Sequence, residues 1–131
     1  SLGNLIEERC VKITEFGKAV RKARLDAEIS LAQMAEALNV SPAFLSGMET
    51  GRKKIASEWV AKIQNFLDDK GVRVEGLAVK ADVSNQTISL EGLSPAHQML
   101  IAGFARTSLT SDEMDNLKKL LEAANTEKEK R

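Results

Sequence analysis

Apolar residues between positions 29 and 51 recur with the period of two short amphipathic helices. In the first half they fall at i, i+3, i+4 and i+7, which is one helical stripe, and they are Leu31, Met34, Ala35 and Leu38. The period breaks at 39–41, where Asn39 tolerates the left-handed conformation that ends many helices. Ser41 followed by Pro42 is an N-cap with a first-position proline, which begins the second helix. The pattern therefore predicts two short helices joined by a tight turn.

The second helix has one apolar side and one side of small residues. Leu45 and Met48 would face the first helix. A side made of small residues can approach another surface closely, which is the layout of a helix-turn-helix. The members of this side lie at i, i+3, i+4 and i+7 and are Ala43, Ser46, Gly47 and Thr50.

Two further helices flank this pair. The first begins at Thr14 as N-cap, ends near Asp26, and has core positions Phe16, Val20 and Ala23. The other runs from about 58 to 69, capped by Ser57 and ended by Gly71. Its expected core residues are Trp59, Val60, Ile63 and Leu67.

The segment 72–93 is expected to be a connector. A short helix is indicated around Leu77, and residues 87–90 alternate like a strand, which could pair with its twin across a dimer axis. The string L-A-x-x-A-x-V-S-x-x-T-I-S at 77–89 also echoes a helix-turn-helix turn, so a degenerate second module remains an alternative.

Residues 94–124 are expected to form a helical hairpin. Ser94 and Pro95 open its first helix, which runs to about Thr107, and Thr110 and Ser111 open the second. Such a hairpin buries too little surface alone, so it needs either the preceding helical domain or a second copy of itself to cover its apolar side. We expect the second copy, which makes the chain a dimer. The dimerisation candidates are Ile88, Leu90, Leu100, Phe104, Met114, Leu117 and Leu121.

Both ends of the chain lack clear structural signals. Residues 125–131 are charged, without apolar anchors, and are expected to be a disordered tail. Residues 1–13 are expected to be an N-terminal arm that folds against the domain, exchanges with a partner or reaches DNA.

Composition narrows the class of protein. Among the 131 residues, 43% are hydrophobic and only 4% aromatic, with two prolines, which suits an all-α protein. The single cysteine, Cys10, allows no intrachain disulfide and favours the cytoplasm, and no apolar run approaches a membrane span. The single histidine, His97, has no partner at metal-ligand spacing. Without a glycine-rich phosphate loop or an acid–base pair, we expect no enzyme, no metal and no cofactor.

Charge is balanced in sum but clustered along the chain. The formal net charge is zero, yet basic residues gather in the first helix and directly after the second helix of the turn motif. These clusters would flank a helix that enters a DNA groove, where phosphates pass. The start of that helix could add backbone N–H groups. The phosphate-binding candidates are Arg21, Lys22, Ser41, Phe44, Arg52, Lys53 and Lys54.

The run L-A-x-M-A-x-x-L-N-V-S-x-x-x-L-S-x-M-E-x-G-R at 31–52 resembles the core of the lambda-repressor-like, or XRE, family of DNA-binding regulators. The resemblance implies a helix-turn-helix domain of four to five short helices at 14–71. It also implies an ion pair between an arginine of the first helix and the glutamate that ends the recognition helix, here Arg24 and Glu49. A structural role is expected for this pair.

Two departures from the family pattern limit direct readout of bases. Leu31 stands where many relatives have a phosphate-binding glutamine, and Pro42, Ala43 and Gly47 offer no side-chain donor or acceptor. What remains is contact of Pro42 or Ala43 with thymine methyls, hydroxyl contacts from Ser46 and Thr50, and DNA shape.

The resemblance implies a sequence-specific DNA-binding regulator, a homodimeric repressor on a (pseudo)palindromic operator. The alternative is an antitoxin-like or adaptor module that uses the same fold to bind a protein partner. Zero net charge and the missing glutamine favour this alternative, while the flanking basic clusters favour double-stranded DNA.

Overall fold

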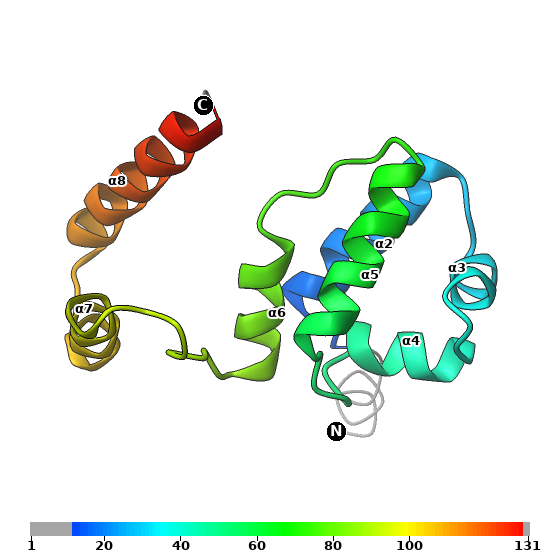
Figure 1. The fold of residues 1–131 in the computed structure, drawn as a ribbon, viewed down its shortest axis with the longest axis horizontal. Helices are drawn as coiled ribbons and strands as arrows, with labels where there is room; N and C mark the ends of the chain where they lie inside the picture. Colours follow the sequence, from blue (N-terminus) through cyan, green and yellow to red (C-terminus); the bar gives the residue numbers. More distant parts are fainter. Residues whose placement is uncertain (1–11, 130–131) are drawn as a thin grey trace, which may run out of the picture. The chain divides into compact units, whose positions relative to one another are not determined.

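The described part of the chain, residues 12–129 of the computed structural model, is built from helices joined by loops (Figure 1). It contains no strand, which confirms the expected all-α class. The expectations for residues 1–11, including Cys10, fall outside the described residues. The helices are α2 (Glu15–Ala27), α3 (Leu31–Ala37), α4 (Pro42–Glu49), α5 (Ser57–Asp69), α6 (Leu77–Asn85), α7 (Pro95–Arg106) and α8 (Ser111–Glu129). They divide into two units, Ser1–Ser89 and Leu90–Arg131.

Polar caps set where the first helices begin. Thr14 accepts a hydrogen bond from the Gly17 N–H, and Ser41 accepts one from the Phe44 N–H. Ser30 and Gln33 form a reciprocal capping box at the start of α3. Each hydroxyl binds one of the N–H groups that the first turn of a helix leaves without a partner, which confirms the predicted N-caps Thr14 and Ser41.

The predicted cap of α5 is wrong by one position. Ser57 is the first residue of the helix, and Ala56 is the N-cap without a side-chain hydrogen bond. Because the Val60 N–H already donates to the Ala56 carbonyl, the helical ladder begins before the Ser57 hydroxyl can act as its cap.

The turn between α3 and α4 has the backbone that the sequence predicts. Asn39 adopts a left-handed conformation with φ 58°, and the Val40 N–H donates to the Ala35 carbonyl over 2.9 Å. Asn adopts this conformation more readily than most residues, which explains why the chain can reverse here without glycine.

The core of the first unit joins helices α2 to α6. Phe16, Met34, Leu45, Met48 and Leu67 are fully buried. Trp59, expected in the core, is only half-buried and packs its ring against Phe44, with 5.1 Å between the centroids. The remaining buried apolar residues are Val20, Ala23, Ala35, Ile55, Ile63, Leu77 and Ala81.

Helix α6 belongs to this core although residues 72–93 were expected to be a connector. It packs against α2 and α5 and buries Leu77 and Ala81. Gln86 ends α6 in a left-handed conformation, and residues 87–90 form no strand, since the described chain offers them no neighbouring strand. The next helix begins only at Pro95, so the tandem helix-turn-helix alternative is wrong.

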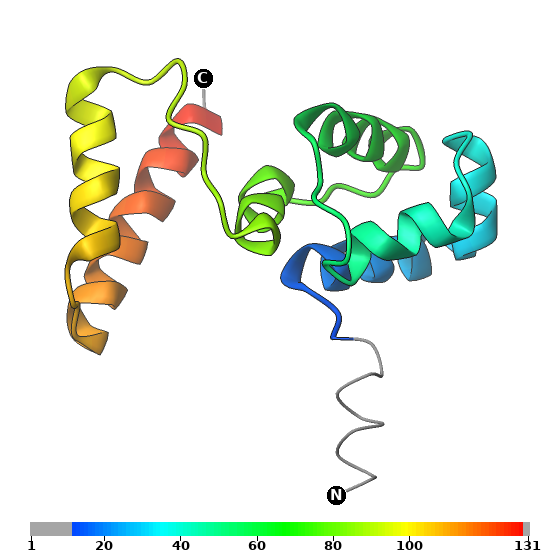
Figure 2. The ribbon, with the colours of Figure 1, turned by 90° about the horizontal axis from the view of Figure 1, so that it is seen from below.

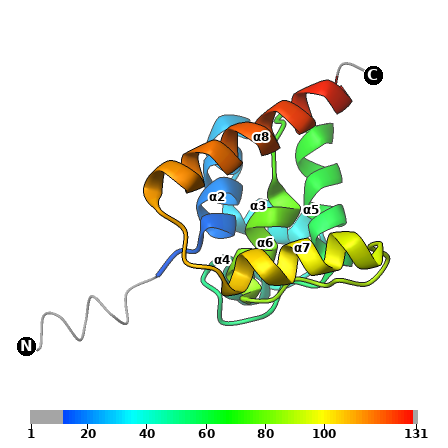
Figure 3. The same ribbon diagram turned by 90° about the vertical axis from the view of Figure 1, so that its left-hand side faces the viewer.

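In the second unit, α7 and α8 diverge from their connecting loop like the arms of an open V (Figures 2 and 3). Ser94 caps α7 by accepting from the His97 N–H, as predicted. The Gln98 side chain donates to the carbonyls of Leu90 and Leu93, which folds the entering chain onto α7. No residue described in this unit is buried.

Helix α8 extends farther than expected. Residues 125–129 were predicted to be disordered, yet the helix continues to Glu129. Alanine, glutamate and lysine near its end are strong helix formers, and no glycine or proline interrupts them. The charged composition therefore describes a solvent-exposed helix end rather than a loss of structure.

Candidate nucleic-acid interface

Helix α4 carries the residues that the sequence predicts to meet DNA. Leu45 and Met48 are fully buried and fix one side of the helix to the core. Pro42 and Ala43 are exposed at its start, and Ser46, one turn later, is half-buried. The outward side of α4 is therefore slim and offers a methyl surface and one hydroxyl.

Two predicted base readers are not free on this side. Gly47 is buried under Lys53, and a Cβ added to it would lie 3.2 Å from the Lys53 Cγ and Cδ atoms. The Thr50 hydroxyl donates to the Ser46 carbonyl over 2.9 Å. Helix periodicity placed both residues on the same side as Ala43. In the structure the loop after α4 folds back over Gly47, and the Thr50 hydroxyl is hydrogen-bonded to the helix backbone.

Lys53 is held along α4. Its N–H donates to the Gly47 carbonyl over 3.1 Å, and its Nζ lies 5.3 Å from the centroid of the Phe44 ring. Phe44 in turn packs on Trp59. These contacts hold the ammonium of Lys53 at the edge of the outward side of α4. Arg52 and Lys54, the two neighbours of Lys53 in the sequence, are exposed.

The start of α4 leaves one backbone donor available within the described chain. Pro42 has no N–H, the Phe44 N–H donates to the Ser41 hydroxyl, and the Leu45 N–H donates to the Ser41 carbonyl. The Ala43 N–H remains. Of the two candidates predicted here, Ser41 serves as the cap and the Phe44 N–H is occupied by it.

Arg21 and Lys22, the two phosphate-binding candidates on α2, point to different sides of the helix. Arg24 faces Glu49, and successive helical residues turn by about 100°, so Lys22 projects about 200° away from Arg24. Lys22 instead lines a groove with Val72 and Arg73. Arg21 lies about 60° from Arg24 on the helix and is exposed.

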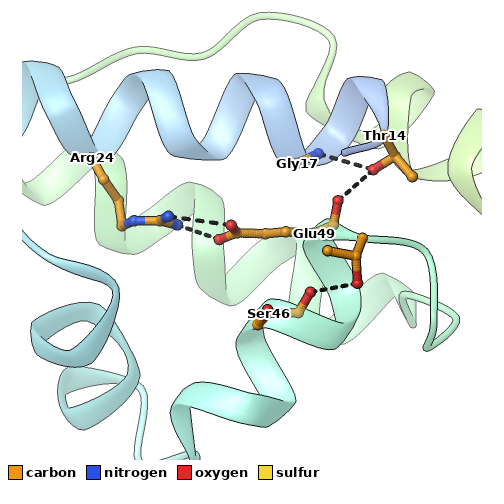
Figure 4. A network of polar contacts seen from close by, with 6 residues as sticks. Thr14, Gly17, Arg24, Ser46 and Glu49 are labelled. Carbon is orange, nitrogen blue, oxygen red and sulfur yellow. Dashed lines mark hydrogen bonds and ion pairs between the residues drawn. The ribbon is translucent and has the colours of Figure 1, made fainter. Parts of the chain in front are cut away.

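A buried ion pair joins α2 to the end of α4 (Figure 4). The Arg24 guanidinium donates to both carboxylate oxygens of Glu49, with 3.2 Å between Nη2 and Oε1. The two side chains are 7% and 3% exposed. The pair implied by the family resemblance is present in the structure and lies in the core.

A second contact, which the sequence did not reveal, lies next to the ion pair (Figure 4). The Glu49 carbonyl accepts from the Thr14 N–H at 3.2 Å and from the Thr14 hydroxyl at 3.0 Å. Gly17 allows this approach, because a Cβ there would lie 2.1 Å from the Glu49 carbonyl oxygen. Only the spacing of Thr14 and Gly17 at the helix start could have hinted at this contact.

The dimerisation candidates of the second unit remain largely exposed. Leu100, Phe104, Met114 and Leu121 are exposed, and Leu117 is half-buried. In the loop before α7, Ile88 is exposed and Leu90 half-buried. Met99 and Leu120 are further exposed apolar side chains of the same helices, although they are not among the dimerisation candidates.

Other kinds of site find no support in the described residues. No three of their His, Cys, Asp or Glu side chains are grouped to hold a metal ion. Among these same residues, no helix combines the length and apolarity needed to cross a bilayer.

Comparison with known proteins gives a match to a family of domains. Residues 15–68 match a protein family described as a helix-turn-helix domain. Curated proteins and solved structures give no match. The matched residues span α2 to α5 and contain the ion pair and the whole of α4.

Proposed function

We propose, starting from the helix-turn-helix domain at residues 15–68, that the chain is a sequence-specific regulator of transcription of the XRE type that binds double-stranded DNA. The observation that carries the proposal is the slim start of α4, with Pro42 and Ala43 exposed and the cation of Lys53 fixed beside it. Such a helix fits a major groove, and adjacent cations meet the phosphates that border the groove.

In the proposed complex, phosphate contacts supply most of the affinity. Arg21, Arg52, Lys53 and Lys54 would hold phosphates, together with the Ala43 N–H at the start of α4. Pro42 and Ala43 would contact thymine methyls, and Ser46 would contribute a hydroxyl. Because base-edge hydrogen bonds are few, DNA shape would supply part of the specificity.

The proposed regulator acts as a homodimeric repressor. One α4 reads few base pairs, and a two-fold pair would read half-sites about 34 Å apart and block the operator by occupying it. The second unit supports pairing, because a second copy would cover its apolar side chains and provide the missing wall of a core. The exposed members are Met99, Leu100, Phe104, Met114, Leu120 and Leu121.

DNA binding is tested by fluorescence anisotropy with a random duplex at increasing salt. A protein that makes several phosphate contacts loses affinity by orders of magnitude between about 50 and 200 mM salt. Lys53→Glu with Lys54→Glu should weaken binding and reduce the slope of log K against log salt by about 2. Lys22→Glu with Lys70→Glu, two exposed cations outside the proposed contacts, is the charge-matched control and should retain most binding.

Selection from a random duplex pool then tests specificity and site symmetry. A symmetric consensus with two half-sites supports the regulator. Absence of salt-dependent binding would contradict it and favour the second candidate, an antitoxin-like or adaptor module. The exposed apolar surface of the second unit is the observation that supports that candidate.

The homodimer is tested by sedimentation velocity. Leu100→Asp with Leu121→Asp should shift the chain from dimer to monomer. Leu25→Asp, which changes a 73% exposed leucine of α2, should leave the dimer intact. A monomeric unsubstituted chain would rule out the proposed assembly.

A further inference from the structure

The side chain of Asn85 binds both backbone groups of a residue far away in the sequence. The Ile55 N–H donates to Asn85 Oδ1 over 2.8 Å, and Asn85 Nδ2 donates to the Ile55 carbonyl over 2.9 Å. Asn85 is the last residue of α6, and Ile55 lies 30 positions earlier in the loop between α4 and α5. The side-chain amide of Asn85 therefore provides the hydrogen bonds that another backbone segment would otherwise provide to Ile55.

The bound residue ends the cationic loop, which we define as residues 51–55. Arg52, Lys53 and Lys54 directly precede Ile55, which is only 4% exposed. At the other side of the loop, the Lys53 N–H is bound to the Gly47 carbonyl of α4. The loop is therefore held at two points, by α4 and by α6.

We propose that Asn85 is a positioning residue for DNA binding, which holds the cationic loop against the edge of α4. This inference rests on the proposed function. It adds that the interface depends on α6, which lies outside the residues 15–68 that match the helix-turn-helix family.

The chemistry of asparagine suits this role. A primary amide offers a donor and an acceptor side by side, which matches the N–H and carbonyl of one residue. Without it, the two partly buried backbone groups of Ile55 must find water, and the loop must move to let water in. A loop that is free before binding has to be ordered when its cations meet phosphate, which weakens binding.

The first test is hydrogen exchange in the unsubstituted chain. The Ile55 N–H should exchange at least tenfold more slowly than the N–H of exposed Lys54, and Asn85→Ala should remove this difference. The core amides of Val20 and Leu67 should keep their protection in the variant. An Ile55 N–H that exchanges as fast as its exposed neighbour would overturn the inference even if the variant does not fold.

The second test is DNA binding in two backgrounds. Asn85→Ala should weaken binding about tenfold in the unsubstituted chain, and less than twofold when Lys53→Ala and Lys54→Ala are already present. A merely structural role would reduce binding by the same factor in both backgrounds. Asn65→Ala, on the exposed side of α5, is the matched control and should leave binding unchanged.

The outcomes separate this inference from the proposed function. If the unsubstituted chain does not bind DNA, both fail. If the unsubstituted chain binds and Asn85→Ala binds equally well, or loses the same factor in both backgrounds, only the positioning role of Asn85 is overturned. A tenfold loss that vanishes without the two lysines supports it.

Discussion

The contact between Gly17 and Glu49 leads to a sharp prediction about stability. A Cβ at position 17 would lie 2.1 Å from the carbonyl oxygen and 2.8 Å from the carbonyl carbon of Glu49. Both atoms belong to the backbone at the end of α4, so no change of side-chain rotamer can make room. Gly17→Ala must therefore push α2 away from the end of α4.

The size of the effect follows from two opposing contributions. Alanine in a helix interior is favoured over glycine by about 0.5–1 kcal/mol. Overpacking of a close contact costs typically about 1–3 kcal/mol, and separation also weakens the two Thr14 hydrogen bonds to the Glu49 carbonyl, about 1 kcal/mol each. We expect a net loss of about 2 kcal/mol in the free energy of unfolding.

Urea unfolding followed by far-UV circular dichroism and the fluorescence of Trp59 measures this loss. Gly17→Ala should lower the midpoint without changing the slope of the free energy against urea. Gly47→Ala is the matched control in the same unit, because its Cβ would meet only the flexible side chain of Lys53, at 3.2 Å. If Gly17→Ala is as stable as Gly47→Ala, the close contact between α2 and α4 is not as described.

Three further predictions concern the ion pair, one helix cap and one candidate base reader. Arg24→Met should destabilise the first unit by about 3–5 kcal/mol because it leaves the Glu49 carboxylate buried and unpaired, and adding Glu49→Leu should recover part of that loss in urea unfolding. The backbone N–H of Thr110, and then its hydroxyl, lower the pKa of Glu113. The contribution of Glu113 to the stability of α8 is therefore complete above the unfolded pKa and is lost as the pH falls through the lower folded pKa, an acid dependence of helix content that Glu113→Gln should remove. Ser46→Ala should cost about 1–3 kcal/mol on the best operator and little on random duplexes, and equal losses on both would indicate a backbone contact.

The elements of the first unit were largely predictable because their signals are local. Hydroxyl residues before apolar periods located the starts of α2 and α4, and Asn39 located the turn. The Arg24–Glu49 pair came from the family resemblance rather than from any local rule. Helix periodicity alone gives the side on which a residue lies, not what covers that side.

What escaped prediction depends on contacts between distant segments. Gly47 was expected on an open surface because nothing in its own helix indicates that Lys53 folds back over it. The amide of Asn85 and the carbonyl contact at Gly17 join residues that lie 30 and more positions apart. Such pairings are determined by how whole helices pack together. The hydrophobic pattern of one segment carries no information about that packing.

The packing of α6 against α2 and α5 limits how this helix-turn-helix unit can be moved between proteins. Similarity to known helix-turn-helix domains ends at residue 68, but Leu77 and Ala81 close the side of α2 and α5 beyond that point. A chimaera that takes only the residues up to 68 would contain the whole of α4, but its core would be exposed where Leu77 and Ala81 are missing. A transplant that keeps its shape has to carry the chain through residue 89.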